Sequence, residues 1–336
     1  MRQSNIELLR VISIFMILIF HSNFLTLGEP THSLLDSNPL LASAQLMFNS
    51  FTVICVDIFV LISGWFGIRP KLKGFLKFIF LCLFFSVSIY IVALLTGDAT
   101  LNVHGVKGCL YMLPLNNWFI RAYLCLYIIS PLINAFIDSS NERMLRNFLI
   151  CFFLFQTLYV WLTGAALFFR LGYSTMSFIG LYSLSRYVRL YPSKLVMYKK
   201  EVYLIGYILI SLFLMVCSFS IILFDRSTLL FKVFGYTNPL VIISSLSLLL
   251  YFSKLKINSR LINWLAASSF AAYLLHANPN IFSKYFASHI RLISSLFNGI
   301  DFSIVLLLYL VGVFISAVLI DQIRIFCWNK VCKLIK

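Results

Sequence analysis

The stretch IELLRVISIFMILIFH, Ile6–His21, is an almost unbroken apolar segment with Arg10 near one end and His21 at the other. Extended to Leu27, it is long enough for a helix that spans a bilayer, for which ~20 apolar residues suffice. Arg10 and His21 are eleven residues apart, 21 minus 10. That spacing is about three helical turns, so both side chains project from one face, ~16 Å apart along the axis. We expect a first membrane span that carries two ionisable groups.

The composition extends this expectation to the whole chain. The protein has 336 residues, of which 61% are hydrophobic and 11% charged. A soluble globular domain is about 45–50% apolar and about 25% charged. The composition therefore excludes a water-soluble protein and predicts an all-α, polytopic transmembrane helix bundle, with residues 1–336 forming a single membrane-embedded domain.

Apolar windows of span length predict about ten membrane helices. The predicted spans are roughly 6–27, 46–66, 75–96, 117–137, 146–166, 174–191, 202–224, 229–252, 262–282 and 303–326. The first is too long for the apolar region of a cleavable signal peptide, which has about 7–15 residues. The eight cysteines match neither a disulfide framework nor a metal-binding spacing, so we expect no bound metal and no permanent cofactor.

The formal net charge of +16 follows a topological bias rather than a nucleic-acid-binding pattern. Basic residues concentrate in alternate loops, at Arg69–Lys77, Arg143–Arg146, Arg186–Lys200 and Lys254–Arg260. The opposite loops hold only Lys107, Arg170, Arg226, Lys232, Lys284 and Arg291. Since cytoplasmic loops carry the excess of Lys and Arg, we expect both termini in the cytoplasm, in agreement with an even number of spans.

One predicted outer loop contains IFSKYFASHIRLISSLF, Ile281–Phe297, with apolar residues at helical spacing. Two interpretations stay open for it. It is either a helix that lies in the outer membrane interface or a loop helix that packs on the bundle.

Further polar residues lie in or beside the other predicted spans. Asp57 is in the middle of the second span, in VDIFVLISGWF, where it could balance Arg10 or orient an imidazole. The fourth span opens with NNWFIRAYLCLYIISPL and places three polar or amphipathic residues near the level of His21: Asn117, Trp118 and Arg121.

The ninth span, NWLAASSFAAYLLH, ends at His276 near the same outer level. Ionisable groups inside a membrane are costly and usually face a polar cavity. The plainer alternatives are that Arg10 extends to the inner surface, that His21 is a packing residue, and that His276 faces interfacial water.

Four segments resemble the acyltransferase-3 family of integral membrane acyltransferases. LRVISIFMILIFH is similar to its arginine and histidine signature with ten residues between, and VDIFVLISGWF to its aspartate–aromatic–Ser-Gly stretch. NWFIRAYLCLYIISPL resembles its Trp-Phe-x-Arg segment, and SSFAAYLLH its Tyr-Leu-x-His ending. They occur in the family's order and, with the predicted topology, cover essentially the whole chain.

The resemblance implies transfer of an acyl group, usually acetyl, from cytoplasmic acyl-CoA to a hydroxyl of an exported or cell-surface glycan. It implies a location in the bacterial cytoplasmic membrane, with acetyl-CoA or another acyl-CoA, the glycan or its lipid-linked precursor, and membrane lipids as partners. Arg10 and His21 would be the central pair, supported by Asp57, Arg121 and His276. Asn117, Trp118 and Arg121 are expected to bind substrate beside them.

The chemistry of the residues agrees with that assignment. Acyl transfer to an alcohol needs a base for the hydroxyl proton and a positive or hydrogen-bonding partner for the carbonyl oxygen. Neutral imidazole is the usual base near neutral pH. A buried arginine supplies a fixed charge for a thioester arm or a phosphate. Transfer through an acyl-histidine stays open beside direct transfer.

The segment GIRPKLKGFLK departs from the Arg-rich cluster that many family members carry after the second span. Lysines can hold phosphate as point charges, so Arg69, Lys71 and Lys73 are candidate contacts to CoA. The alternative interpretation is that these residues only anchor the cytoplasmic side of the membrane helices. A succinyl donor, and peptidoglycan or a small molecule as acceptor, also remain open.

The alternative function is a transporter or flippase for a polysaccharide or its lipid-linked precursor, with Arg10 and His21 lining the substrate path. Such proteins commonly show inverted repeats or broken helices, and the sequence shows no internal repeat. Transfer from acetyl-CoA by purified protein without any gradient would distinguish the two classes.

Overall fold

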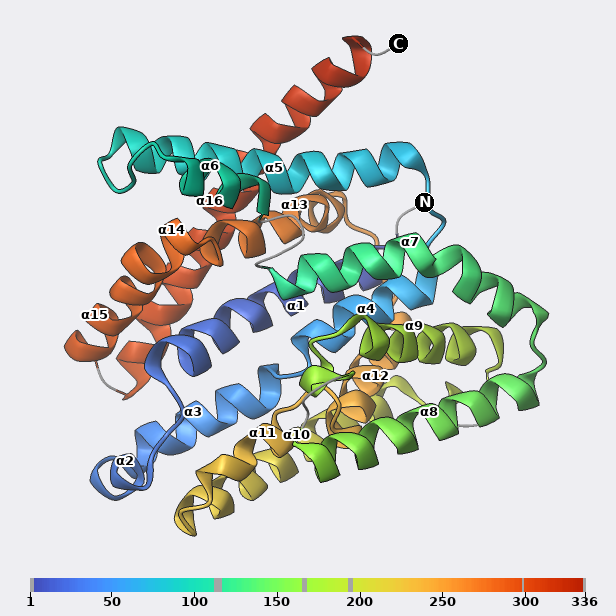
Figure 1. The fold of residues 1–336 in the computed structure, drawn as a ribbon. Coiled ribbons are helices and arrows are strands. Elements are labelled where there is room, and N and C mark those ends of the chain that lie inside the picture. The colour runs from blue at the N-terminus through green and yellow to red at the C-terminus, as the bar shows by residue number, and fades with distance from the viewer. Residues whose placement is uncertain (1–2, 112–116, 165–167, 193–195, 298, 335–336) are drawn as a thin grey trace.

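The computed structural model describes residues 3–111, 117–164, 168–192, 196–297 and 299–334, and in these ranges it contains helices and no strand. The helices form one bundle, and both ends of the chain lie on the side away from α2 and α15 (Figure 1). The elements of the first half are α1 (Ser4–Phe20), η1 (His21–Leu27), α2 (His32–Ser37), α3 (Pro39–Thr52), α4 (Cys55–Phe66), α5 (Leu72–Leu95), α6 (Val103–Tyr111), α7 (Trp118–Ser139) and α8 (Glu142–Thr163). Those of the second half are η2 (Arg170–Gly172), α9 (Thr175–Leu190), α10 (Lys200–Leu223), η4 (Ser227–Leu229), α11 (Leu230–Val233), α12 (Pro239–Ser253), α13 (Arg260–His276), α14 (Pro279–Ile281), η5 (Phe282–Ala287), α15 (Ser288–Leu296) and α16 (Gly299–Leu334).

The prediction of a polytopic helix bundle is confirmed, but the count of ten spans is not. Within the described residues, seven segments are long and apolar enough to cross a membrane. They are Ser4–Leu27, Pro39–Phe66, Leu72–Leu95, Trp118–Ser139, Glu142–Thr163, Lys200–Leu223 and Gly299–Lys333.

The predicted spans 174–191, 229–252 and 262–282 are shorter helices, α9, α12 and α13, of 16, 15 and 17 residues. At 1.5 Å per residue, such helices are ~22–26 Å long, less than the ~30 Å of a hydrocarbon core. All three helices bury serine side chains inside the bundle.

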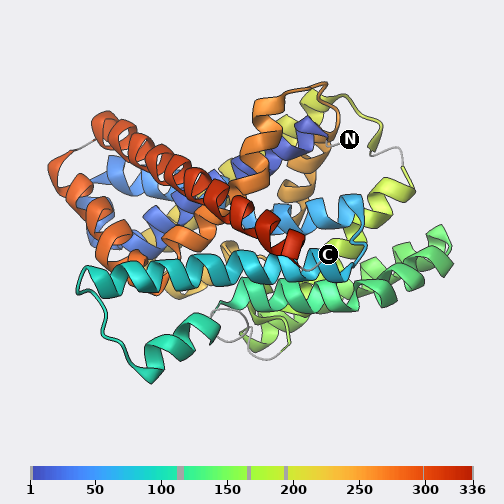
Figure 2. The ribbon, with the colours of Figure 1, turned by 90° about the horizontal axis from the view of Figure 1, so that it is seen from above.

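Helix α1 lies in the middle of the bundle, as Figures 1 and 2 show. Its neighbours include α3, α4, α12, α13 and α16. Ile6, Leu9, Ile14 and Leu18 are fully buried, because apolar residues surround the helix on most sides. The polar groups that α1 carries are therefore placed inside the protein rather than toward lipid.

Helices α4 and α9 approach at backbone contact. A Cβ atom at Gly64 would lie 2.4 Å from the carbonyl oxygen of Tyr182, so only glycine fits there. The Ser185 hydroxyl donates to the carbonyl oxygen of Leu61 at 2.6 Å across the same contact. This close packing draws the short helix α9 into the bundle.

Two loops descend into the bundle because α9 and α12 are short. The backbone is left-handed at Arg170, Leu171 and Gly172, with φ of 45°, 57° and 97°, and these residues deliver Tyr173 to the interior. The Tyr236 amide donates to the carbonyl oxygen of Leu171 at 3.1 Å, so the second loop packs directly on the first. Left-handed non-glycine residues are strained, and such strain concentrates at functional sites.

Within the described residues, two ion pairs in membrane-spanning helices join residues three apart. Arg10 donates to Glu7 at 2.9 Å on α1. On α16, Arg324 donates to both carboxylate oxygens of Asp321 at 2.9 and 2.7 Å.

The segment that follows α13 packs on the bundle. Phe286 and Ile290 are buried, and α15 contacts α16 and η1. The structure therefore shows that this helix packs on the bundle, as in one of the two interpretations that the sequence left open.

Candidate active site

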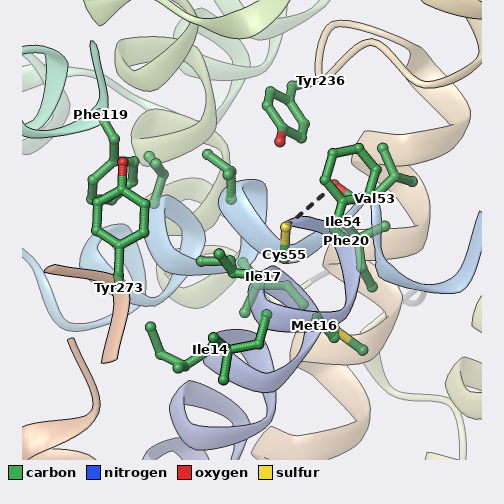
Figure 3. Close-up of a cluster of buried hydrophobic side chains, with 14 of the residues drawn as sticks. Ile14, Met16, Ile17, Phe20, Val53, Ile54, Cys55, Phe119, Tyr236 and Tyr273 are labelled. Carbon is green, nitrogen blue, oxygen red and sulfur yellow. Dashed lines mark hydrogen bonds between the residues drawn. The ribbon is translucent and has the colours of Figure 1, made fainter. Parts of the chain in front are cut away.

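A cavity of about 160 Å³ lies beside His21, between α1, α4, α7 and α13. Its wall is largely aromatic, and the lining residues are Ile17, Phe20, His21, Leu25, Val56, Phe59, Trp118, Phe119, Tyr173, Tyr236, Phe270 and Tyr273. Figure 3 shows part of this wall, with Phe119 and Tyr273 side by side and the Tyr236 hydroxyl directed toward Cys55. An apolar cavity with a few polar groups is the usual form of a small-molecule site.

His21 and His276 meet at the edge of this cavity. His21 Nδ1 lies 2.9 Å from His276 Nε2, and the ring centroids are 5.0 Å apart. His276 is fully buried and its Nδ1 lies 2.6 Å from the carbonyl oxygen of Ala272. The structure thus brings together two histidines that are 255 residues apart in the sequence.

These contacts fix the tautomers of the neutral pair. A carbonyl oxygen only accepts, so His276 Nδ1 carries the proton and donates to Ala272. His276 Nε2 is then an acceptor, and His21 donates to it from Nδ1. His21 Nε2 is left with a free lone pair, and among the described residues it has no hydrogen-bond donor. The arrangement resembles a base oriented by a second group, as general-base catalysis requires.

Asn117, Trp118 and Arg121 lie at the start of α7, near this pair. The Asn117 side chain caps the helix by accepting from the Ile120 amide at 3.2 Å, and it also accepts from the Tyr273 hydroxyl at 2.8 Å. Trp118 forms part of the cavity wall. Arg121 follows one turn later and is half-buried.

Asp57 is fully buried in the first turn of α4, next to cavity residue Val56. It was expected to balance Arg10 or to orient an imidazole. Neither contact is present: neither carboxyl oxygen has a hydrogen-bond partner within the described ranges, and Arg10 pairs with Glu7 instead. The sequence signal for the true partner was the spacing of three residues between Glu7 and Arg10, which places both on one helix face.

The Arg10 side chain is 28% exposed and donates one hydrogen bond to Glu7, whose side chain is 6% exposed. The guanidinium group has five N–H donors. Arg10 is therefore held in place while most of its donors stay open to another group.

Arg69, Lys71 and Lys73 are exposed in and after the α4–α5 loop. Tyr127 fixes this loop, because its hydroxyl accepts from the Lys71 amide at 2.9 Å and donates to the Lys71 carbonyl oxygen at 3.1 Å. Exposed side chains on a fixed backbone suit contact with a soluble anion.

Two further arginines, which the sequence indicated only as positive-inside residues, lie beside the α4–α5 loop. Arg189 donates to the carbonyl oxygen of Trp65 at 2.7 Å and stacks on the Trp65 ring at 5.1 Å. Arg186 lies against Gly67, 3.8 Å from Asp138, and its buried Nε has no partner within the described ranges. Their spacing of three residues near the end of one helix was the sequence signal that could have placed them together.

Tyr173 and Tyr236 were not predicted from the sequence. Both contact Trp118: the Trp118 ring centroid lies 4.4 Å from that of Tyr173 and 6.2 Å from that of Tyr236. Each residue belongs to a loop that descends into the bundle, and no local pattern indicated how deep these loops lie.

The comparisons with known proteins bear on this site. Comparison with curated proteins and with solved structures returned no match. The acyltransferase domain model matches residues 3–321, which include the arginine, the aspartate, both histidines and the aromatic wall described above. An imidazole pair beside an aromatic cavity in a multi-pass membrane protein agrees with that match. The chain belongs to the acyltransferase-3 family and is a membrane acyltransferase.

Proposed function

We propose that this protein transfers an acyl group, most simply acetyl, from cytoplasmic acyl-CoA to a hydroxyl group of an exported or cell-surface glycan. The observation that carries the proposal is the chain of hydrogen bonds from Ala272 through His276 to His21. It leaves His21 Nε2 as a free base at the edge of the aromatic cavity.

In the proposed reaction, His21 Nε2 accepts the proton of the acceptor hydroxyl as that oxygen attacks the thioester carbonyl carbon. A C–O bond forms, the C–S bond breaks, and the proton passes from His21 to the departing thiolate. His276 is a positioning residue here, because its acceptor nitrogen holds the proton of His21 on Nδ1. Asp57 belongs to this site by family resemblance, and no hydrogen bond within the described residues assigns its role.

The donor is proposed to enter from the opposite end of α1. Arg10 has free donors for the thioester arm or a phosphate, and it lies ~16 Å from His21 along the helix axis. Arg69, Lys71 and Lys73 provide exposed positive charge at the α4–α5 loop, and Arg189 adds a planar guanidinium group there. Phosphates of CoA are the anions that suit such a corner.

The acceptor is proposed to bind against Trp118, Tyr173 and Tyr236. Tyrosine and tryptophan combine a broad apolar ring face with a polar group, which suits a sugar that has both C–H faces and hydroxyls. Asn117 and Arg121 lie at the adjoining helix start and would contact acceptor hydroxyls.

The test uses glycan acylation by purified protein supplied with acetyl-CoA. His21→Gln keeps hydrogen bonding but removes the base, so the rate should fall by about 10²–10⁴-fold. His104→Gln is the matched control, because His104 is exposed on α6 and should leave the rate unchanged. Wild-type activity of His21→Gln at equal expression would remove His21 from the chemistry.

The proposed orientation, with both termini in the cytoplasm of a bacterial cell, is supported by the bias of Lys and Arg among the loops. In a cysteine-free background, an impermeant thiol reagent should label Ser295→Cys on α15 but not Ser139→Cys at the end of α7. Both serines are exposed, so accessibility differs only by side of the membrane. The reverse labelling pattern would reject the scheme of a donor inside and an acceptor outside.

A further inference from the structure

The element η5, Phe282–Ala287, covers the imidazole pair. The Phe286 ring lies 4.9 Å from the His276 ring, and the Phe282 ring lies 6.4 Å from the His21 ring, measured between centroids. Phe286 is only 1% exposed. Each imidazole therefore has a phenyl ring of η5 against it.

The opposite face of η5 is tied to another part of the chain. Lys284 and Tyr285 lie between the two phenylalanines in sequence, and both side chains donate to Asp98. Each uses a different oxygen, Oδ1 for the Lys284 ammonium and Oδ2 for the Tyr285 hydroxyl. One carboxylate thus holds two consecutive residues of η5.

Asp98 lies on a hydrogen-bonded turn after α5. Its amide donates to the carbonyl oxygen of Ala93 at 2.7 Å, and Gly97 takes the left-handed conformation, with φ of 76°, that the turn requires. The Tyr90 hydroxyl donates to the carbonyl oxygen of Thr100 at 2.9 Å and holds the rest of the loop. The contact therefore joins η5 to the end of a long helix.

The charge state of Asp98 suits this role. Hydrogen bonds from Lys284 and then Tyr285 lower the pKa of the Asp98 carboxyl below its usual value. The carboxylate is therefore charged at neutral pH, where it accepts from both donors.

We propose that Asp98 is a positioning residue that holds η5 over the imidazole pair and so directs the acyl group to the acceptor hydroxyl rather than to water. The inference rests on the proposed function. In transfer, the acceptor oxygen bonds to the carbonyl carbon and CoA leaves as the thiol. In hydrolysis, a water oxygen takes that place, and the products are the free acid and the thiol. Exclusion of water from a closed site suppresses this side reaction.

The first experiment measures how tightly η5 covers the imidazole pair, and it does not depend on activity. Phe286→Cys in a cysteine-free background places a thiol at the buried position next to His276. Adding Asp98→Asn should raise its labelling by a small thiol reagent roughly tenfold, because local opening becomes easier when a charged partner is lost. Asp301→Asn is the matched control, since Asp301 is exposed at the start of α16 and should change nothing.

The second experiment measures the ratio of free acid to acylated glycan formed from acetyl-CoA, with native cysteines retained. Asp98→Asn should raise this ratio severalfold at equal amounts of folded protein, and Asp98→Glu should restore most of the wild-type value. Exchange of the two charges, Asp98→Lys with Lys284→Asp, should also bring the ratio back toward wild type.

The outcomes separate the two proposals. If the wild-type protein acylates no hydroxyl, the proposed function fails, while the labelling result still reports on the cover. If wild type transfers normally and Asp98→Asn leaves the ratio unchanged, this inference is overturned even where labelling rises. Unchanged labelling in Asp98→Asn also overturns it.

Discussion

The ion pairs Glu7–Arg10 and Asp321–Arg324 share a spacing of three residues, but they differ in the burial of the arginine and in the number of hydrogen bonds. Arg10 is 28% exposed and gives Glu7 a single hydrogen bond of 2.9 Å. Arg324 is 2% exposed and gives both oxygens of Asp321 a hydrogen bond. Both arginines keep further N–H groups, but those of Arg324, including Nη1, which has no partner among the described residues, are buried in the bundle, whereas Arg10 is open enough to reach a ligand.

The difference follows from desolvation. Removing one partner of a fully buried pair leaves an uncompensated charge in the interior, which is strongly destabilising. Glu7 is buried as well, but Arg10 is partly exposed, so water can replace Glu7 around its guanidinium group and the loss of the pair costs less. Arg324 is thus committed to the fold, whereas Arg10 is held in place at low cost and can serve a ligand.

The largest effect is expected from Asp321→Ala, which leaves the Arg324 guanidinium buried without its partner. The free energy of unfolding should fall by about 3–5 kcal/mol, measured as the loss of monodisperse protein in detergent and a lower thermal midpoint. The double replacement Asp321→Leu with Arg324→Met should recover most of it, because apolar residues of similar volume replace a buried pair well. A stable single variant would contradict the proposed structural role.

A smaller effect, on activity rather than folding, is expected from Arg10→Lys. Lysine keeps the charge but loses the planar fork, so transfer should fall about tenfold, equivalent to about 1.4 kcal/mol in the barrier, while the protein stays folded. The control is Arg260→Lys, at the exposed start of α13. Full activity of Arg10→Lys would favour the alternative in which Arg10 only reaches the membrane surface.

The smallest effect is expected from Glu7→Gln. Glutamine fills the same buried position, retains an acceptor for Arg10 and removes only the charge. Because Arg10 is partly exposed, the free energy of unfolding should change by less than about 1 kcal/mol. Thermal unfolding of this variant beside Asp321→Ala gives the comparison directly. If both variants lose the same free energy of unfolding, burial does not explain the difference between the two ion pairs.

Much of the fold could be predicted from the sequence, because long apolar segments identify membrane helices directly. The errors have physical causes. Helix α3 begins at Pro39 rather than near residue 46, since Asn38 caps it and proline fits its first turn. Helices α9 and α13 were predicted as spans, yet they are shorter because protein rather than lipid surrounds them.

The site was predictable in part. The sequence placed His21, Trp118 and His276 at one level, and the structure brings His21 into contact with His276 and both His21 and Trp118 to the cavity wall. Tyr173 and Tyr236 were missed because their depth depends on where two short helices end. No single-helix pattern carries that information.

The contact between the two descending loops has a consequence for protein engineering. A Cβ at Gly172 would lie 2.4 Å from the Cβ of Tyr236, so neither loop has room to change alone. An attempt to graft acceptor preference from another family member should therefore exchange both loops in one step. A chimera that receives only one of them would place two loop surfaces in contact that are not complementary in shape.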